Sequence, residues 1–277
     1  MANETMYFAF ANESGEIVPQ LFTNPKRMIV ANTIDEVLDC MQKVEQAVAQ
    51  GDYAAGYVSY EAAPAFNPAM KVHGHPTMPL FVFGIFEKPA TEQLKSDEAF
   101  TIWTVGEDTT RAQYDEAISA IHEAIERGDT YQTNYTIRLH AKSNGNPVAL
   151  FQEMQYAQQA KYTAYLHVAD HQIVSASPEL FFRLKDGVIT TRPMKGTVKR
   201  GRYHEEDEQL ASMLYHSEKN RAENVMIVDL LRNDLGQIAE TDTVTVERLF
   251  DIEKYPTVHQ MTSTIKAKIS SDKTIIG

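Results

Sequence analysis

Two segments of this chain repeat their apolar residues at the spacing of an amphipathic helix. The first follows a capping-box pattern formed by Thr33 and Glu36, and it ends before Gly51. Its apolar positions are Ile34, Val37, Leu38, Met41, Val44 and Val48. The second covers about residues 110–127, ends before Gly128, and has an apolar face of Ala117, Ile118, Ile121 and Ile125. Further helices are predicted at 147–158 and about 205–235, and another is considered near 257–266.

Runs of β-branched and aromatic residues lie before, between and after these helices. Strands are predicted at 5–10, 53–60, 80–86 and 131–141, and turn residues 12–15 predict that the first strand enters a hairpin. Four runs between residues 162 and 191 predict an antiparallel meander, and another strand is predicted at 244–250. The order lacks the regular βαβ alternation of a parallel sheet, and it shows no internal repeat. The fold class predicted is therefore α+β.

The charge balance narrows the classes of partner. With 26 basic and 38 acidic residues, the 277-residue chain has a formal net charge of −12. This balance opposes binding to nucleic acid or to a membrane surface, since both need a concentrated basic surface. The first residues show no signal-peptide pattern and no segment is long and apolar enough to span a bilayer, so a cytoplasmic protein is expected. The single cysteine, Cys40, excludes an internal disulfide and a multi-cysteine zinc site.

Lys195 is the first candidate for chemistry. It stands in TRPMKGT, residues 191–197, directly after a predicted strand, with Pro193 before it and Gly196 after it. Proline stiffens the backbone and glycine permits close approach, so this segment can direct an amine into a pocket. A lysine is nucleophilic where a low-dielectric or cationic setting favours the neutral amine. Taken alone, however, a solvated surface charge is the commoner use of a loop lysine.

Two glutamates are the other candidates. Glu179 precedes Lys195 by sixteen residues across a predicted hairpin, so the two can exchange protons in one pocket, unless they form only a surface salt bridge. Glu223 shares a helical stripe with Ile227, Leu230 and Asp234, which predicts carboxylates on a core-facing surface. Mg²⁺ would satisfy such carboxylates, and the alternative is helix capping or pairing with nearby arginines.

These motifs resemble, in order and spacing, the chorismate-utilising enzymes, in particular component I of aminodeoxychorismate synthases. The matching segments are residues 56–66, 128–136, 175–184, 191–197, 221–238 and 255–265. The resemblance implies layered antiparallel sheets flanked by helices, enclosing chorismate. It implies that residues 1–277 form the N-terminal portion of one chorismate-binding catalytic domain, with a smaller β-rich region at 1–100 and the first part of the core at 101–277.

The resemblance also implies a role for each candidate. Lys195 would add to C2 of chorismate while the C4 hydroxyl leaves, and ammonia would then attack C4 and expel the lysine. Glu179 resembles the general acid/base of this reaction, and Glu223 resembles a ligand of the Mg²⁺ ion that holds the substrate carboxylate. Gly196 and Thr197 would border the same pocket.

Two positions separate this chain from other branches of the family. Anthranilate synthases usually carry alanine in place of Lys195, so the lysine favours amination at C4. Isochorismate and salicylate synthases use a lysine to activate water where this chain has Gln132. A histidine of anthranilate synthases aligns with Gln260, which leaves His259 one position out of register and without an assigned role.

The resemblance further implies a separate glutamine amidotransferase subunit that supplies ammonia, because the chain contains no glutaminase motif. Family members continue past the position of Gly277 through an arginine-containing strand and a late glutamate of the Mg²⁺ site. A C-terminally truncated chain with little activity alone is therefore expected. Anthranilate synthase component I and a non-catalytic folded fragment remain the alternatives.

Overall fold

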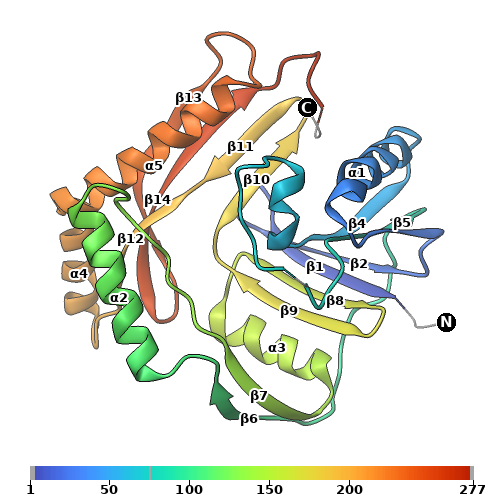
Figure 1. Ribbon diagram of the computed structural model, residues 1–277, viewed down its shortest axis with the longest axis horizontal. Helices are drawn as coiled ribbons and strands as arrows, with labels where there is room; N and C mark the ends of the chain where they lie inside the picture. Colours follow the sequence, from blue (N-terminus) through green and yellow to red (C-terminus); the bar gives the residue numbers. More distant parts are fainter. Residues whose placement is uncertain (1–3, 75, 275–277) are drawn as a thin grey trace. The chain divides into compact units, whose positions relative to one another are not determined.

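The computed structural model describes residues 4–74 and 76–274 of the chain. The chain forms two compact units (Figure 1). The first contains the residues up to Leu94 together with those from Phe151 onward, and the second contains Lys95–Leu150. Every strand pair in the described residues is antiparallel, and helices accompany the sheets, so the predicted α+β class is confirmed.

A four-stranded sheet in the first unit joins the start of the chain to its middle. Its order is β2 (Ile17–Thr23), β1 (Thr5–Ala11), β8 (Tyr162–Val168) and β9 (His171–Ser177). The predicted hairpin of β1 and β2 is confirmed. Phe151 of α3 (Pro147–Gln158) packs on this sheet, with its ring 5.5 Å from that of Tyr7 and 6.1 Å from that of Tyr165. These aromatic contacts fix the helix against β1 and β8.

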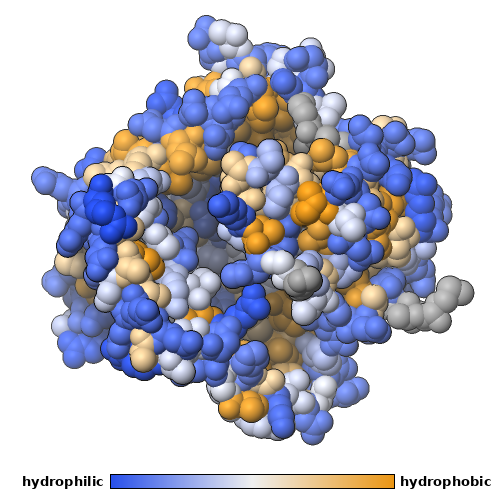
Figure 2. All heavy atoms as spheres, viewed as in Figure 1, coloured by the Kyte–Doolittle hydropathy of each residue, from blue (hydrophilic) through white to orange (hydrophobic). Residues whose placement is uncertain are grey.

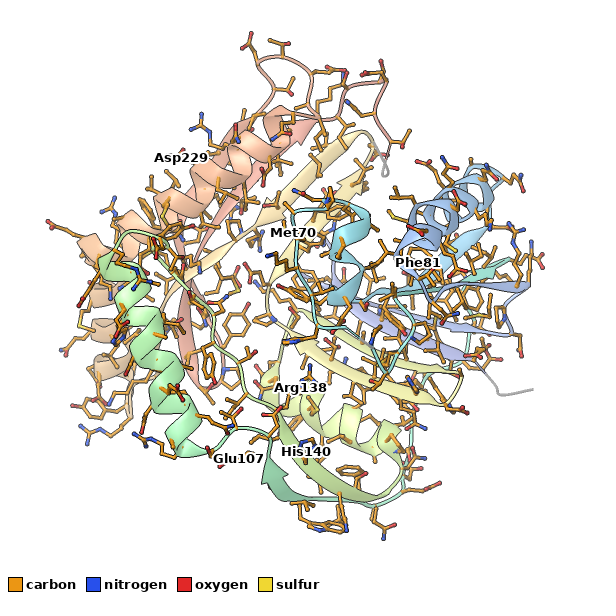
Figure 3. The ribbon with its side chains drawn as sticks, viewed as in Figure 1. Met70, Phe81, Glu107, Arg138, His140 and Asp229 are labelled. Carbon is orange, nitrogen blue, oxygen red and sulfur yellow. The ribbon has the colours of Figure 1, made fainter. Side chains whose placement is uncertain are left out.

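A three-stranded sheet, also in the first unit, packs against the first predicted helix. Its order is β3 (Arg27–Ala31), β5 (Phe81–Phe86) and β4 (Tyr53–Val58), and the 3₁₀ helix η1 (Tyr60–Ala65) follows β4. The capping box of Thr33 and Glu36 begins α1 (Ile34–Ala49), as predicted. Phe81 lies in the core between β5 and α1 (Figure 3), where it shares a buried cluster with Val37 and Cys40.

A five-stranded sheet carries Lys195, Gly196 and Thr197 of the candidate residues. Four strands run in the order β10 (Leu180–Lys185), β11 (Val188–Arg192), β14 (Val258–Lys268) and β12 (Met194–Lys199), and β13 (Thr245–Lys254) also pairs with β14. Two helices, α4 (His204–His216) and α5 (Glu218–Gly236), pack on this sheet. Val228 and Leu235 of α5 meet Ile265 of β14 in a buried cluster.

The four strands at 162–191 do not form one meander. The strands exist as predicted, but β8 and β9 belong to the four-stranded sheet while β10 and β11 belong to the five-stranded sheet. The chain crosses between the sheets at Ser177, Pro178 and Glu179. Proline has no N–H to donate to a strand ladder, so Pro178 favours the end of one ladder and the start of another.

Three predictions about the C-terminal half are wrong. The helix predicted at 205–235 is two helices, because Ser217 adopts an extended backbone and its hydroxyl accepts a hydrogen bond from the N–H of Asn220, capping α5. The helix considered at 257–266 is the strand β14, whose residues are buried on both faces and therefore lack the alternation of a half-buried strand. The core-facing stripe of α5 is also shifted by one residue, since its buried residues are Asn224, Val228 and Leu235.

The second unit has a two-stranded sheet and a helix. The strands are β6 (Phe100–Glu107) and β7 (Leu139–Gly145), and α2 (Arg111–Glu126) confirms the second predicted amphipathic helix. The strand predicted at 131–141 is wrong over most of its length, since pairing begins where Leu139 meets Glu107, the last residue of β6. Residues 131–138 lie beyond that end and have no partner strand among the described pairings.

Much of the face shown in Figure 2 is hydrophilic, with apolar side chains exposed between the polar ones. This mixture agrees with the composition, because 43% of the residues are hydrophobic and 23% are charged. Large exposed apolar side chains include Phe181 at 86%, Tyr156 at 84% and Tyr60 at 81% of their accessible surface. Of these, Phe181 lies on β10, an edge strand of the five-stranded sheet.

Gly56 is expected to be essential to the pairing of β4 with β5. A Cβ atom added there would lie 1.9 Å from the carbonyl oxygen of Val82 and 2.7 Å from the Cα of Phe83, so the strands would have to separate. We expect Gly56→Ala to lower the free energy of unfolding by about 1–3 kcal/mol, measured by urea denaturation. Gly236→Ala is the control, because a Cβ there meets no atom within 4 Å. Equal stability of the two variants would contradict the strand geometry.

Candidate active site

The crossover between the two sheets places Glu179 beside the strand of Lys195. Glu179 directly precedes β10, and its Oε1 accepts a hydrogen bond of 3.0 Å from the backbone N–H of Met194. The hydroxyl of Ser177 lies 3.3 Å from the backbone nitrogen of Glu179 and from its carbonyl oxygen. The carboxylate of Glu179 is thus held one residue before Lys195, so the structure brings these two predicted residues together.

Lys195 lies at an irregularity of β12. Met194 pairs with Thr262 and Thr197 pairs with Gln260, so three residue steps on β12 oppose two on β14. The extra residue is a β-bulge, a feature that redirects a side chain at a strand edge. Gly196 accommodates it with a φ of +106°, a conformation in which a side chain is strained. The bulge explains why a glycine follows the half-buried Lys195.

Thr197 and Gln260 form the next pair along these strands. The hydroxyl of Thr197 donates a hydrogen bond of 2.8 Å to Oε1 of Gln260. Gln260 is the residue that stands where anthranilate synthases are expected to have a histidine. Thr197, two residues after Lys195, therefore orients the amide oxygen of Gln260. Gln260 thus lies close to the bulge that carries Lys195.

Glu223 lies on α5 at the boundary between core and surface. Its side chain is 42% exposed, and Oε1 lies 3.9 Å from Nζ of Lys219, one turn earlier. The carboxylate of Glu223 thus pairs with Lys219. The guanidinium of the neighbouring Arg221 lies instead 4.4 Å from the centre of the Phe250 ring. Asp229, on the exposed side of the same helix (Figure 3), pairs with Arg232 at 2.9 Å.

The fit of this neighbourhood to Mg²⁺ depends on Glu223. Among residues 4–74 and 76–274, no group of three or more His, Cys, Asp or Glu side chains is arranged to hold a metal ion. Mg²⁺ commonly keeps several waters and takes only one or two protein carboxylates together with substrate oxygens. A half-exposed carboxylate with one distant ion-pair partner fits that mode of binding, whereas a metal cage made of protein alone does not exist in the described residues.

Gln132 belongs to the second unit and is described there by itself. It is exposed and lies in the segment between α2 and β7 that forms no strand. Its carbonyl oxygen accepts a hydrogen bond of 3.1 Å from the hydroxyl of Thr130.

A buried ionic network next to β12 was not predicted from the sequence. Asp207 of α4 accepts hydrogen bonds of 2.7 and 2.8 Å from Arg200, and it lies 2.8 Å from Nε2 of His259 on β14. The guanidinium of Arg200 and the N–H of Gly201 hold the pKa of Asp207 well below its usual range. The available signal was a charged residue, Arg200, directly after β12 and shortly before a helix whose first turn is acidic.

A second network joins the two large sheets near the crossover. Glu253 of β13 accepts hydrogen bonds of 2.7 Å from Lys161, 3.2 Å from Arg192 and 2.7 Å from the hydroxyl of Tyr255. Burial raises the pKa of Glu253, but the hydrogen bonds from Lys161 and Tyr255 and the charge of Arg192 outweigh it, so the net pKa is lowered. The Tyr255 hydroxyl also lies 3.4 Å from the carbonyl oxygen of Pro178, which ties this network to the segment of Glu179.

None of the described helices combines the length and apolar character needed to cross a bilayer.

Comparison with known proteins identifies one family whose model spans the chain, and relatives that match part of it. A family model described as chorismate binding enzyme matches residues 4–277. Aminodeoxychorismate synthase component 1 from Escherichia coli (strain K12) is 39% identical over 180 residues, which are 65% of this chain and 40% of that protein. Anthranilate synthase component 1 from Aquifex aeolicus is 36% identical over 160 residues, 58% of this chain and 32% of that protein. The matched region thus spans less than half the length of these relatives.

Solved structures agree on the fold. Anthranilate synthase component I from Streptococcus pneumoniae is similar with a TM-score of 0.71 at 20% identity, over 100% of this chain and 71% of that one. MenF, the menaquinone-specific isochorismate synthase from Escherichia coli, gives a TM-score of 0.68 at 14% identity, over 99% of this chain and 66% of that one. At these identities the likeness establishes the fold alone.

The Asp207 network is expected to make stability depend on pH in the acid range. Because the pKa of Asp207 is lowered in the folded state, its contribution is complete above the pKa of the unfolded chain and is lost as pH falls toward the folded value. We expect Asp207→Asn to lower the Tm at pH 7 and the difference from wild type to shrink below about pH 4. Glu205→Gln, an exposed change on the same helical turn, is the control. A Tm difference that stays constant down to pH 2.5 or so would contradict this role.

Proposed function

We propose that this chain, which belongs to the chorismate binding enzyme family, carries the nucleophile and the acid/base group of an enzyme that replaces the C4 hydroxyl of chorismate with ammonia. The observation that carries the proposal is the placement of Lys195 on the β12 bulge, with the carboxylate of Glu179 bound to the preceding residue. The 39% identity to aminodeoxychorismate synthase component 1 of Escherichia coli supports the same reaction.

In this proposal the reaction has two steps. The neutral amine of Lys195 attacks C2 of chorismate, the double bonds shift, and the C4 hydroxyl accepts a proton from Glu179 and leaves as water. Ammonia then attacks C4, the double bonds shift back, and the bond between C2 and the lysine nitrogen breaks. Glu179 accepts the proton that the new C4 ammonium loses, so lysine and glutamate both return to their starting states. The product is 4-amino-4-deoxychorismate.

The neighbouring residues would orient the substrate. Gly196 would border the pocket and permits the bulge through its positive φ, while the oriented pair of Thr197 and Gln260 offers polar groups at the pocket border. Glu223 would hold the Mg²⁺ ion, whose charge, when bound, pairs with a substrate carboxylate. Gln132, which belongs to the second unit, could not activate water as a lysine does, since a neutral amide is not a base at physiological pH.

Ammonia would come from a separate glutamine amidotransferase subunit. The relatives named component 1 support this assignment, because such a name implies a second component. The matched segment covers 40% of the Escherichia coli protein. The whole reaction is therefore proposed for an enzyme of that relative's length.

Anthranilate synthase component I is the second candidate, favoured by the 36% identity to the Aquifex aeolicus protein. The two reactions differ in the position that receives ammonia. A lysine that adds at C2 blocks amination there and leaves C4 as the site of attack. Lys195 therefore favours the first candidate over the second.

Product analysis decides between the candidates. The protein is incubated with chorismate, an ammonium salt and Mg²⁺, both as this chain and as the complete reading frame that encodes it, and the product is identified by mass spectrometry. We expect 4-amino-4-deoxychorismate. Anthranilate as the main product would overturn the proposed reaction, and chorismate left unchanged by both forms would favour a non-catalytic fragment.

Substitution of the two proposed catalytic residues should remove activity in different ways. We expect Lys195→Ala to abolish the chorismate adduct detected on the protein by mass spectrometry, because no other amine occupies that position. Glu179→Gln should keep the lysine and lower kcat by about 10²–10⁴-fold, since it cannot transfer the proton. Lys199→Ala is the control on the same strand, where the side chain is exposed. An adduct that survives in Lys195→Ala would exclude this lysine as the nucleophile.

A further inference from the structure

Asn224 is a fully buried polar residue that lies opposite the bulge of β12. It has 0% of its surface exposed and stands on the sheet-facing side of α5, directly after Glu223. A buried amide without hydrogen-bond partners is destabilising, so its partners indicate what it does. They are all backbone or side-chain groups of β12 and β14.

The bulge explains why a side chain is needed at this point. Between the pairs of Met194 with Thr262 and of Thr197 with Gln260, Lys195 and Gly196 both oppose Met261. At such a point the ladder of backbone hydrogen bonds is interrupted, so backbone groups need other partners. Nδ2 of Asn224 donates to the carbonyl oxygen of Lys195 at 3.3 Å and to that of Met261 at 3.5 Å. One amide therefore bridges the two strands where they fail to pair.

The orientation of this amide is fixed from the other side. The hydroxyl of Ser263 donates a hydrogen bond of 2.5 Å to Oδ1 of Asn224, and it accepts one of 3.2 Å from the N–H of Phe250. Oδ1 is thereby defined as the acceptor end, which turns Nδ2 toward the carbonyl of Lys195. Aspartate would offer no donor to that carbonyl, and an apolar residue would offer neither group.

The same helix holds the bulge by contact one turn earlier. A Cβ atom on Gly196 would lie 3.2 Å from Cβ of Asn220 and 3.2 Å from Cβ of Met261, so the glycine is closely packed between α5 and β14. Asn220 and Asn224 are four residues apart and share one face of α5. The Lys195 carbonyl and the glycine that follows it are therefore both held by α5.

We propose that Asn224 is a positioning residue that fixes Lys195 relative to α5, the helix that carries Glu223. The significance of this for catalysis rests on the proposed function of Lys195. The amine of Lys195 and the carboxylate of Glu223 belong to different elements, and Asn224 links the backbone of one directly to the helix of the other. Loss of the link lets the bulge shift while the side chain of Lys195 stays intact.

The kinetic test compares two truncations on one face of α5. Asn224→Ala removes the link, and Val228→Ala removes a residue that is equally internal, with 3% exposure, but packs on Ile265 away from Lys195. With the complete enzyme, chorismate and ammonium, we expect Asn224→Ala to lower kcat by about 10–100-fold with a KM for chorismate that changes much less. Val228→Ala should lower the Tm and keep kcat near wild type. Equal kcat values for the two variants below their melting temperatures would overturn the proposal.

A chemical test separates this proposal from the proposed reaction. The folded protein is treated with an amine-reactive reagent, and peptide mapping gives the labelling rate of Lys195 relative to that of exposed Lys199 on the same strand. We expect Asn224→Ala to change this ratio by about threefold or more and Val228→Ala to leave it unchanged. An unchanged ratio in folded Asn224→Ala would refute the positioning role, whatever product the enzyme forms. If Asn224→Ala changes the labelling ratio but the enzyme forms anthranilate, the positioning role stands and only the proposed reaction is refuted.

Ser263→Ala provides a second variant should Asn224→Ala fail to fold. It keeps Asn224 and removes only the hydroxyl that orients its amide. We expect the labelling ratio and kcat to shift in the same direction as in Asn224→Ala, by a smaller factor. Values identical to those of wild type would overturn the proposal on their own.

Discussion

The pairing of β14 with three other strands is the constraint on which the candidate site depends. β14 lies between β11 and β12 in the sheet and also pairs with β13. Its residues from Met261 to Ile265 are all buried. A strand enclosed in this way cannot slide by one residue without turning polar side chains into apolar surroundings. The irregularity between β12 and β14 is therefore fixed in position, and with it the place of Lys195.

Much of the fold could be predicted from the sequence because local signals agreed with the final structure. The capping box at Thr33, the helical spacing after it and the hairpin at residues 12–15 depend on neighbouring residues and were confirmed. Errors arose where distant partners decide the outcome. β14 is buried on both faces and has no alternation to recognise, and the division of residues 162–191 between two sheets is decided by pairing with β1 and β14.

The candidate site was predicted in part. The neighbourhood of Glu179 and Lys195 could be expected from a hairpin, and the structure places the carboxylate of Glu179 on the backbone of Met194. The partners of Asn224, and His259 as a partner of Asp207, could not be expected because they are far away in the chain, whereas Arg200 lies only seven residues from Asp207 and was an available signal. The stripe through Glu223 was misplaced by one residue, since an asparagine looks polar in the sequence while its amide is fully satisfied in the core. The roles of these residues in catalysis stay predictions.

The way the bulge is held has a consequence for how chemistry changes within such a scaffold. The local fold at position 195 is maintained by its carbonyl group, by the glycine that follows and by an amide on a neighbouring helix. None of these contacts uses the lysine side chain. These backbone contacts therefore fix where the side chain of residue 195 begins without specifying which side chain it is, so its placement and its identity are encoded by different residues.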